Sequence, residues 1–378
     1  MTLTYGLLST YPPTACGLAT FTSALAAGIS ASSERADDCV IVRAVESPGG
    51  SPRDVVAELV AGSAASRRRA IDALNDTDVV IIQHEYGIFG GEDGDEVLDV
   101  IEALTVPVIV VLHTVPLEPT AHQRSVLEAV VGATDIAVTM TDAARRRLAA
   151  GYKVDMTKVS VIPHGAHVAP RPAIADIGID RPTILTWGLI GPGKGIEWGI
   201  EALALLGDLR PRPRYLVVGK THPKVLAAHG EAYRSDLQAR ARRLGLSSEV
   251  EFDATYLDVP SLQRIVGRST LVLLPYDSTD QITSGVLIDA VAAGKPVIST
   301  RFPHAVELLG GGVGLLVAHR DPTAIADAVR RVISNTPLRE TMATSAERLA
   351  PGLAWTAVAD RYRTAAEQLV ALRAAAVA

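Results

Sequence analysis

Short apolar runs alternate with longer stretches of helical pattern along almost the whole sequence. This alternation is typical of α/β folds, in which helices connect buried parallel strands. It is interrupted once, at residues 164–181, where prolines and glycines break both patterns. The sequence therefore predicts two Rossmann-like, doubly wound domains, at residues 1–168 and 181–354, joined by a linker and facing a central cleft at the carboxyl ends of their strands.

The individual elements follow from the same patterns. In the first half, we expect strands at 4–9, 39–44, 79–83, 108–113, 136–139 and 159–162, and helices at 18–29, 55–74, 121–131 and 142–150. In the second half, we expect strands at 183–187, 214–218, 250–252, 271–275, 296–299 and 314–317. Two closing helices, at 337–349 and 355–378, have no further strand to cover.

The composition of the 378 residues limits the possible functions. Hydrophobic residues make up 48% and charged residues 21%, as in soluble globular proteins. The net charge of −6 argues against a nucleic-acid-binding protein, which usually has a basic surplus. No apolar run approaches the ~20 residues of a membrane span, and the first residues do not resemble a signal peptide. We therefore expect a cytoplasmic protein with reduced Cys16 and Cys39.

Residues 279–298, TDQITSGVLIDAVAAGKPVI, suit a bound phosphate. A polar turn containing Thr283 and Ser284 leads into an apolar helix that begins at Gly285. Free backbone N–H groups and the helix dipole would concentrate partial positive charge there. Asp289 interrupts the helix, and a buried carboxylate needs a hydrogen-bond donor such as a ribose diol. An ordinary helix with Asp289 facing solvent is the alternative.

Gln281 and Asp289 have the spacing of a known motif. The segment resembles the Glu-x7-Glu motif of retaining GT-B glycosyltransferases of family 4. The resemblance implies that Asp289 holds the nucleotide ribose, that Gln281 lies near the hydroxyls of the donor sugar, and that the amides of Thr283, Ser284 and Gly285 hold the diphosphate. Here an amide and a shorter carboxylate replace the two glutamates, although an amide can still hydrogen-bond sugar hydroxyls.

The segment 188–195, GLIGPGKG, opens the second domain. It comes close to a P-loop, but Gly195 stands where Ser or Thr would hold Mg²⁺. It is more similar to the Gly-Arg-x4-Lys-Gly segment of family 4, with Lys194 in the lysine position and Leu189 in place of the arginine. The resemblance implies that Gly188 and Lys194 bind the donor and that Lys194 neutralises the leaving diphosphate.

Three loops of the first domain also match the family. Gly17, in TYPPTACG, matches a glycine that lets the backbone approach the diphosphate. His113, at the end of PVIVVLHT, matches a catalytic-site histidine near the donor's C6 hydroxyl. The segment QHEYGIFGG resembles one branch of the family, which implies that His84, Glu85 and Tyr86 form the acceptor pocket. Each loop could instead be a plain structural turn.

Acidic residues occur twice in a DxD pattern, at 76–78 and at Asp93 and Asp95. The first pair precedes a strand and the second lies near a helix start, where acidic residues are favoured for structural reasons. We therefore expect no metal ion. The only small molecule that the sequence demands is the nucleotide-diphosphate sugar that serves as donor substrate, so no cofactor is required.

The resemblance covers nearly the whole chain and implies a retaining hexosyltransferase of the GT-B fold, whose closing helix packs back onto the first domain. It extends to actinobacterial α-mannosyltransferases that use GDP-mannose in polysaccharide biosynthesis; UDP-glucose is the alternative donor. The expected acceptor is a soluble oligosaccharide, because the arginine runs at 67–69 and 145–147 are too short for firm membrane binding. A homodimer is compatible with the sequence. A non-catalytic nucleotide-sugar-binding protein and a P-loop NTPase are the alternatives from other classes.

Overall fold

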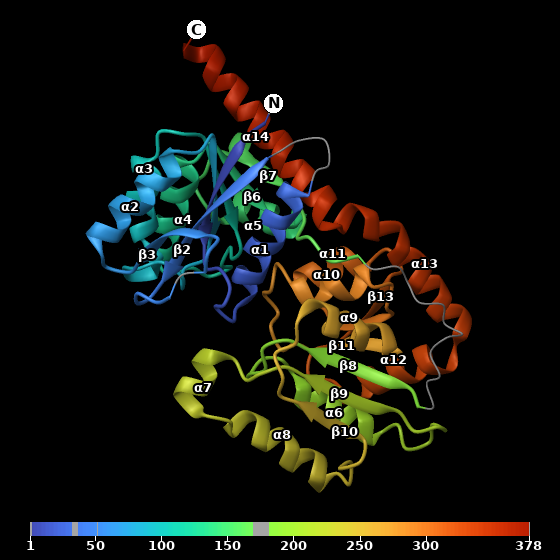
Figure 1. Ribbon diagram of the computed structural model, residues 1–378. Helices are drawn as coiled ribbons and strands as arrows, with labels where there is room; N and C mark the ends of the chain where they lie inside the picture. Colours follow the sequence, from blue (N-terminus) through green and yellow to red (C-terminus); the bar gives the residue numbers. More distant parts are fainter. Residues whose placement is uncertain (1, 32–36, 51, 169–180, 378) are drawn as a thin grey trace. The chain divides into compact units, whose positions relative to one another are not determined.

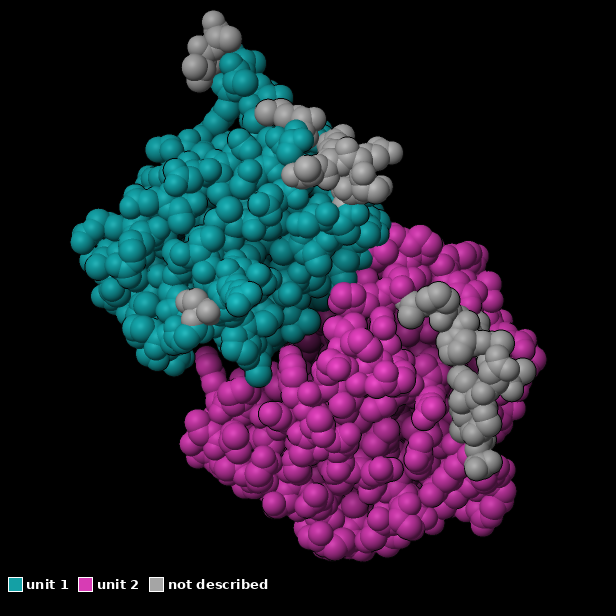
Figure 2. All heavy atoms as spheres, viewed as in Figure 1, with its two compact units in different colours: residues 1–165, 355–378 teal, residues 166–354 magenta. Residues whose placement is uncertain are grey.

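The protein folds into two compact units, each with its own parallel sheet. The computed structural model describes residues 2–31, 37–50, 52–168 and 181–377. Unit 1 comprises Met1–Gly165 and Trp355–Ala378, and unit 2 comprises Ala166–Ala354 (Figure 2). Most of the predicted linker, at 169–180, lies outside the described residues. Two parallel sheets of this kind confirm the predicted α/β fold class.

Unit 1 contains a seven-stranded sheet with the order β3-β2-β1-β4-β5-β6-β7, all parallel. Its central strands are runs of aliphatic residues buried on both faces, as helices on both faces require. The strands are β1 (Thr4–Ser9), β2 (Asp38–Val45), β3 (Val55–Val60), β4 (Val79–His84), β5 (Val108–Leu112), β6 (Ile136–Thr139) and β7 (Val159–Val161).

The helices of unit 1 begin where a side chain can accept the first free backbone N–H groups. Ser63, Thr120 and Thr141 accept such bonds at the starts of α2, α4 and α5. The helices are α1 (Gly17–Ser30), α2 (Ala64–Asn75), α3 (Glu96–Ala103), α4 (Ala121–Ala133), α5 (Asp142–Gly151) and α14 (Trp355–Val377), with short 3₁₀ turns at Glu92–Gly94 and Met156–Lys158 (Figure 1).

Unit 2 contains a six-stranded parallel sheet with the order β10-β9-β8-β11-β12-β13. Its strands are β8 (Thr183–Trp187), β9 (Arg214–Val218), β10 (Val250–Asp253), β11 (Leu271–Leu274), β12 (Val297–Thr300) and β13 (Gly314–Val317). Its helices are α6 (Ile196–Ala204), α7 (Pro223–His229), α8 (Ala232–Arg243), α9 (Val259–Arg268), α10 (Gly285–Ala292), α11 (Pro303–Leu309), α12 (Pro322–Ser334) and α13 (Thr336–Leu353).

One predicted element is wrong. The helix expected at 55–74 is strand β3 followed by helix α2. β3 is the edge strand of its sheet and is only partly buried, so its sequence VVAELV lacks the long apolar run of an interior strand. Gly62, with φ of 73°, and the N-cap residue Ser63 separate the two elements.

The last helix, α14, packs against α1 in unit 1 (Figure 1). A Cβ on Gly28 of α1 would lie 2.9 Å from the Trp355 carbonyl oxygen, so a glycine permits this close approach. The buried guanidinium of Arg363 donates to the carbonyl oxygens of Gly28 and Ile29 at the end of α1. It also pairs with buried Asp37 at 3.4 Å.

The strand order reverses at the same point in both sheets. β1 lies beside β4 in unit 1, and β8 lies beside β11 in unit 2. Ligands of doubly wound sheets bind at the carboxyl ends of the strands at such a switch point. The predicted site residues lie at or after the ends of these strands, except for His113, which follows β5, and Asp289, which lies within α10. Among the described residues, none of the helices has the length and apolar character of a membrane span.

Candidate functional site

Three loops of unit 2 meet at the carboxyl ends of β8, β9 and β11. The N–H of Gly188, directly after β8, donates to the Val218 carbonyl at 3.0 Å. Gly219, with φ of 131°, follows β9, and a Cβ there would lie 1.9 Å from the Gly188 oxygen, so only glycine fits. A Cβ on Gly188 would lie 3.6 Å from Val286, which places the first loop against the start of α10.

Lys194 lies in the loop after β8, at the edge of this cluster. Its ammonium nitrogen is 4.4 Å from the ring centroid of Tyr276, which follows β11. Within the described part of the chain, no ion pair includes Lys194. A cation over an aromatic face without a carboxylate partner keeps its charge available for an anionic ligand.

The loop has a backbone that excludes the P-loop geometry. Gly195 has φ of 63°, and a Cβ there would lie 1.8 Å from the Pro275 carbonyl oxygen. A serine or threonine that holds Mg²⁺ therefore cannot replace it without moving the loop. The Asp277 N–H donates to the Gly193 oxygen at 2.9 Å and ties the loop to the segment after β11.

The turn before α10 corrects one prediction. Ser284 is buried and caps the helix, because its Oγ accepts from Leu287 N–H at 3.3 Å. Its own N–H donates to Nδ1 of His304 at 2.9 Å. The Ser284 amide, predicted to hold a diphosphate, is therefore already bonded. The amides of Gly285 and Val286 lack an acceptor inside the helix because the helix begins there.

Gln281 and Thr283 form the rest of this turn. The Gln281 side-chain amide donates to the Thr283 carbonyl at 2.9 Å, so it bends back onto its own loop. The Thr283 hydroxyl is buried and has no hydrogen-bond partner among the described residues. A buried hydroxyl without a partner is costly unless a ligand or a water molecule bonds to it.

Asp289 lies one turn into α10 and is partly exposed. Burial of its carboxyl group among protein atoms raises the pKa from 3.8 to about 7. No hydrogen bond offsets this burial within the described chain. The Asp289 carboxylate is therefore only partly solvated, and a ligand that donates hydrogen bonds would stabilise it.

In unit 1, Gly17 is the first residue of α1, after the loop that follows β1. A Cβ on Gly17 would meet no atom within 4 Å, so packing inside the described chain does not require a glycine here. Cys16 caps the helix through its sulfur, which accepts from Ala19 N–H at 3.4 Å. The open space at Gly17 is compatible with close approach of a ligand.

His113 follows β5 and is a neutral imidazole. Its Nε2 lies 2.8 Å from Oε1 of Gln83, and its ring contacts Phe21 edge-on at 4.9 Å. Burial, with smaller contributions from His164 and His84, lowers the pKa of His113 to about 3. The bond to Gln83 occupies Nε2, and a neutral imidazole has one donor nitrogen and one acceptor nitrogen. His113 can accept a hydrogen bond at neutral pH but cannot donate a proton as an acid.

The predicted acceptor residues divide into two groups. His84 ends β4 with 0% exposure, and burial lowers its pKa to about 4. In this structure His84 cannot touch an acceptor, which corrects the prediction. Glu85 and Tyr86 are partly exposed. Glu85 accepts from the Thr114 hydroxyl at 2.5 Å, and the Tyr86 hydroxyl donates to the Gln123 carbonyl at 3.1 Å.

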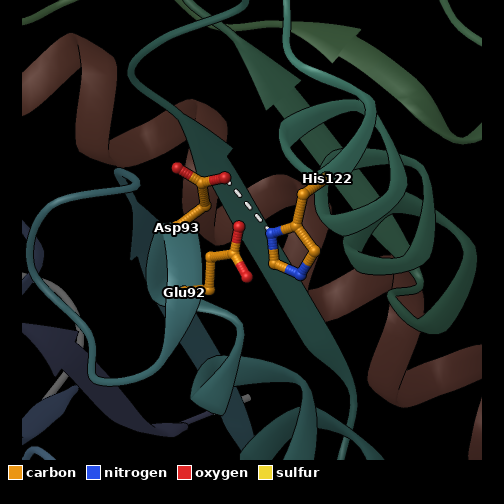
Figure 3. A group of neighbouring side chains, drawn as sticks. All are labelled: Glu92, Asp93 and His122. Atoms are coloured by element: carbon orange, nitrogen blue, oxygen red, sulfur yellow. Dashed lines mark hydrogen bonds and ion pairs between the residues drawn. The ribbon is translucent and has the colours of Figure 1, made fainter.

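Three side chains in unit 1 have the spacing of a metal site (Figure 3). Ligand atoms of Glu92, Asp93 and His122 lie within 4.8 Å of one another. His122 pairs with Asp93 at 3.2 Å and with Asp95 at 3.6 Å. His122 thus contacts both aspartates, and the expectation that Asp93 and Asp95 are structural and hold no metal ion stays a prediction.

Sequence reasoning missed His304 and Tyr276. Both are buried, and both touch the predicted donor loops. The segment RFPH, directly after an apolar strand run, was the available signal for His304. Tyr276 stands just beyond a strand end, where aromatic residues serve many structural purposes, so its sequence position alone carried no signal.

Known proteins share both the sequence pattern and the fold. Residues 181–335 match the family model for glycosyl transferases group 1. The D-inositol 3-phosphate glycosyltransferase of Nocardioides sp. is 30% identical over 264 residues, covering 64% of this chain and 56% of the relative. The same-named protein of Corynebacterium jeikeium is 29% identical over 257 residues, covering 64% and 59%. The chain thus spans less than two thirds of these relatives' length.

Solved structures match over nearly the whole chain. Anabaena Alr3699/HepE in complex with UDP gives a TM-score of 0.75 at 17% identity, covering 98% of this chain and 100% of that one. Sucrose-phosphate synthase from Thermosynechococcus elongatus gives 0.73 at 16% identity, covering 98% and 99%. This chain therefore has the GT-B fold of these glycosyltransferases, and its second unit carries the sequence pattern of the group 1 glycosyltransferases.

Proposed function

We propose that the protein is a retaining glycosyltransferase that moves a hexose from a nucleoside diphosphate sugar to a hydroxyl group. The observation that carries this proposal is the carboxyl group of Asp289. It is largely desolvated, accepts no hydrogen bond from the described residues, and lies one turn beyond the open amides of Gly285 and Val286. A ribose diol bonded to Asp289 and a diphosphate at the helix start would satisfy both groups.

The reaction requires that the negative charge developing on the leaving diphosphate be stabilised. Lys194 supplies a cation, and the amides of Gly285 and Val286 supply aligned dipoles. The unpartnered hydroxyl of Thr283 supplies a further donor. Because Leu189 replaces the arginine of the motif, Lys194 has a larger share of this stabilisation than a lysine paired with an arginine would have.

Retention follows from a front-face reaction. The bond from the anomeric carbon to the diphosphate oxygen breaks as the acceptor oxygen bonds to the same face, and the acceptor proton passes to the departing diphosphate. This route needs no protein nucleophile. It fits a neutral His113, which hydrogen-bonds the sugar through Nδ1. We assign Glu85 and Tyr86 to the acceptor, and Gly17 and Gly188 to backbone contacts with the donor.

For the donor we propose GDP-mannose, with UDP-glucose as the alternative, on the basis of the sequence resemblance. An oligosaccharide hydroxyl is the proposed acceptor. We propose an inositol phosphate as the alternative acceptor, because the relatives are named D-inositol 3-phosphate glycosyltransferases.

A ligand screen tests the donor. Thermal unfolding is measured with GDP, UDP, GDP-mannose and UDP-glucose, because a ligand of the folded state raises its stability by about 2.7 kcal/mol at 100 times its Kd. Transfer to oligosaccharides and to inositol phosphate is then followed by NMR of the anomeric proton. We expect one donor to stabilise the protein and the product to keep the α configuration.

Three results would contradict the proposal. If none of the four ligands raises the unfolding temperature, the donor site is wrong. If a donor binds tightly but is neither transferred nor hydrolysed, the protein is a non-catalytic nucleotide-sugar-binding protein. An inverted product would leave the donor site in place but exclude the front-face reaction.

A further inference from the structure

We infer that His304 is a positioning residue that holds the donor-binding turn in its active shape, an inference that rests on the proposed function. His304 is the second residue of α11, directly after β12. Its side chain is 3% exposed. The turn that it touches, Gln281–Ser284, is 20 to 23 residues earlier in the chain and precedes α10.

Two hydrogen bonds connect His304 to this turn. Nδ1 accepts from the Ser284 N–H at 2.9 Å, and the His304 N–H donates to the Gln281 carbonyl at 3.4 Å. The first bond has a normal length and is buried, and it fixes the direction of the peptide that enters α10. His304 therefore bonds to the first and the last residue of the turn.

These two bonds determine which hydrogen-bonding groups of the turn are available to a ligand. The Ser284 N–H is bonded to His304 and its Oγ accepts from the Leu287 N–H, so the backbone amide of Ser284 is not available to a ligand. The next amide, at Gly285, and the hydroxyl of Thr283 then keep a fixed direction. Preorganised donors stabilise developing charge without reorganisation, so loss of the His304 bond should weaken diphosphate binding.

The required feature is a hydrogen-bond acceptor two bonds beyond Cβ. An asparagine oxygen stands at the same number of bonds from Cα as Nδ1 of histidine, so His304→Asn keeps the bond. His304→Leu removes the acceptor at similar side-chain volume. In His304→Gln, the oxygen lies one bond farther out and cannot occupy the Nδ1 position.

The test is titration calorimetry of the full chain with GDP and UDP, followed by donor and acceptor kinetics. For the nucleotide that the wild type binds, we expect His304→Leu to raise Kd at least tenfold, and His304→Asn to stay within threefold. The donor KM should rise in His304→Leu while the acceptor KM stays unchanged. A general loss of stability would not raise the donor KM while leaving the acceptor KM unchanged.

Each outcome decides between distinct ideas. If the wild type binds neither nucleotide, the proposed function itself fails. If the wild type binds one and His304→Leu binds it equally well, the role of His304 is refuted. It is equally refuted if Asn is as weak as Leu, because packing and not the hydrogen bond would then matter. If His304→Leu does not fold, the nucleotide affinities of His304→Gln and His304→Asn are compared instead. Equal affinity of these two variants would refute the inference.

Discussion

The ammonium nitrogen of Lys194 lies 4.4 Å from the ring centroid of Tyr276, which in turn stacks on Phe302 at 5.4 Å. A cation over an aromatic ring gains about 0.5–2 kcal/mol, depending on its exposure to water. This contact orients the side chain without neutralising it, since none of the ion pairs among the described residues includes Lys194. The charge is held in place for another partner.

We therefore expect Lys194→Ala to lower kcat by about 10²–10³-fold, the range found when one donor to a developing oxyanion is removed. The unfolding temperature should fall by only a few degrees, because the lysine loses its contact with the Tyr276 ring but no buried ion pair. Steady-state kinetics with the donor found in the screen measures the first effect and thermal unfolding the second. Lys153→Ala, which removes an exposed lysine of unit 1, is the control. Unchanged turnover in Lys194→Ala would remove this residue from the mechanism.

Asp289→Asn tests the ribose contact through its pH dependence. The free carboxyl group has a pKa of about 7, and only its ionised form accepts hydrogen bonds from both ribose hydroxyls. The affinity of the wild type for the nucleoside diphosphate should therefore rise as the pH increases from 6 to 8. The asparagine variant should bind at least tenfold more weakly at pH 8, and its affinity should increase less over this interval. Titration calorimetry at several pH values measures both, and parallel pH profiles would refute the ribose assignment.

The same substitution should stabilise the ligand-free protein at alkaline pH. The pKa of Asp289 is raised by burial, from 3.8 to about 7, so its stabilising, protonated form is complete below pH 3.8 and is lost as the pH rises through 7. The free energy of unfolding of Asp289→Asn should thus exceed that of the wild type by about 2–4 kcal/mol at pH 8.5, since one pKa unit corresponds to about 1.4 kcal/mol. At pH 4 the two values should differ little. Urea unfolding at both pH values measures this difference. A difference that stays constant between pH 4 and pH 8.5 would contradict the raised pKa of Asp289.

The interior strands and the loops after them could be predicted from the sequence, because a buried parallel strand must be a run of apolar residues. β5 and β11 are wholly apolar, β4 and β8 are mostly so, and the carboxyl ends of these strands carry the candidate site. β3 escaped prediction because an edge strand is only half buried and its pattern resembles that of a helix. His84 was misjudged for a related reason, since the buried part of β4 continues through its last residue.

The hydrogen bond between His304 and Ser284 could not be predicted, because it joins the start of α11 to the turn before α10, and these segments meet only in the packed fold. The same holds for Tyr276 under Lys194. Residue type and spacing indicated where an anion would bind. The partners that orient those groups lie in segments that follow neighbouring strands, and they carry no local pattern of their own.

Arg363 of α14 gives a stability prediction for unit 1. Its guanidinium pairs with Asp37, whose side chain is only 1% exposed, and bonds to the end of α1. Arg363→Met would leave that buried carboxylate without its cation, which should cost about 3–5 kcal/mol. Hydrogen exchange of α1 and α14 should rise accordingly, while exchange in unit 2 stays unchanged. Arg361→Met, at an exposed neighbouring position, is the control, and equal exchange in both variants would contradict the prediction.

Gly195→Ser separates the proposed donor loop from a P-loop, because it completes the G-x4-G-K-S pattern. In a P-loop NTPase the new hydroxyl would bind Mg²⁺ and promote hydrolysis of ATP or GTP. Here the backbone φ is 63° and the new Cβ would lie 1.8 Å from the Pro275 oxygen, so the loop must move and Lys194 with it. We expect a loss of stability of about 2–3 kcal/mol and at least tenfold weaker binding of the nucleoside diphosphate, with no gain of hydrolysis. Gly207→Ser, at a glycine whose Cβ would meet nothing within 4 Å, should leave both properties unchanged. Magnesium-dependent hydrolysis in Gly195→Ser would favour the NTPase. It would show that the loop accepts the serine without strain and binds Mg²⁺ as a P-loop does.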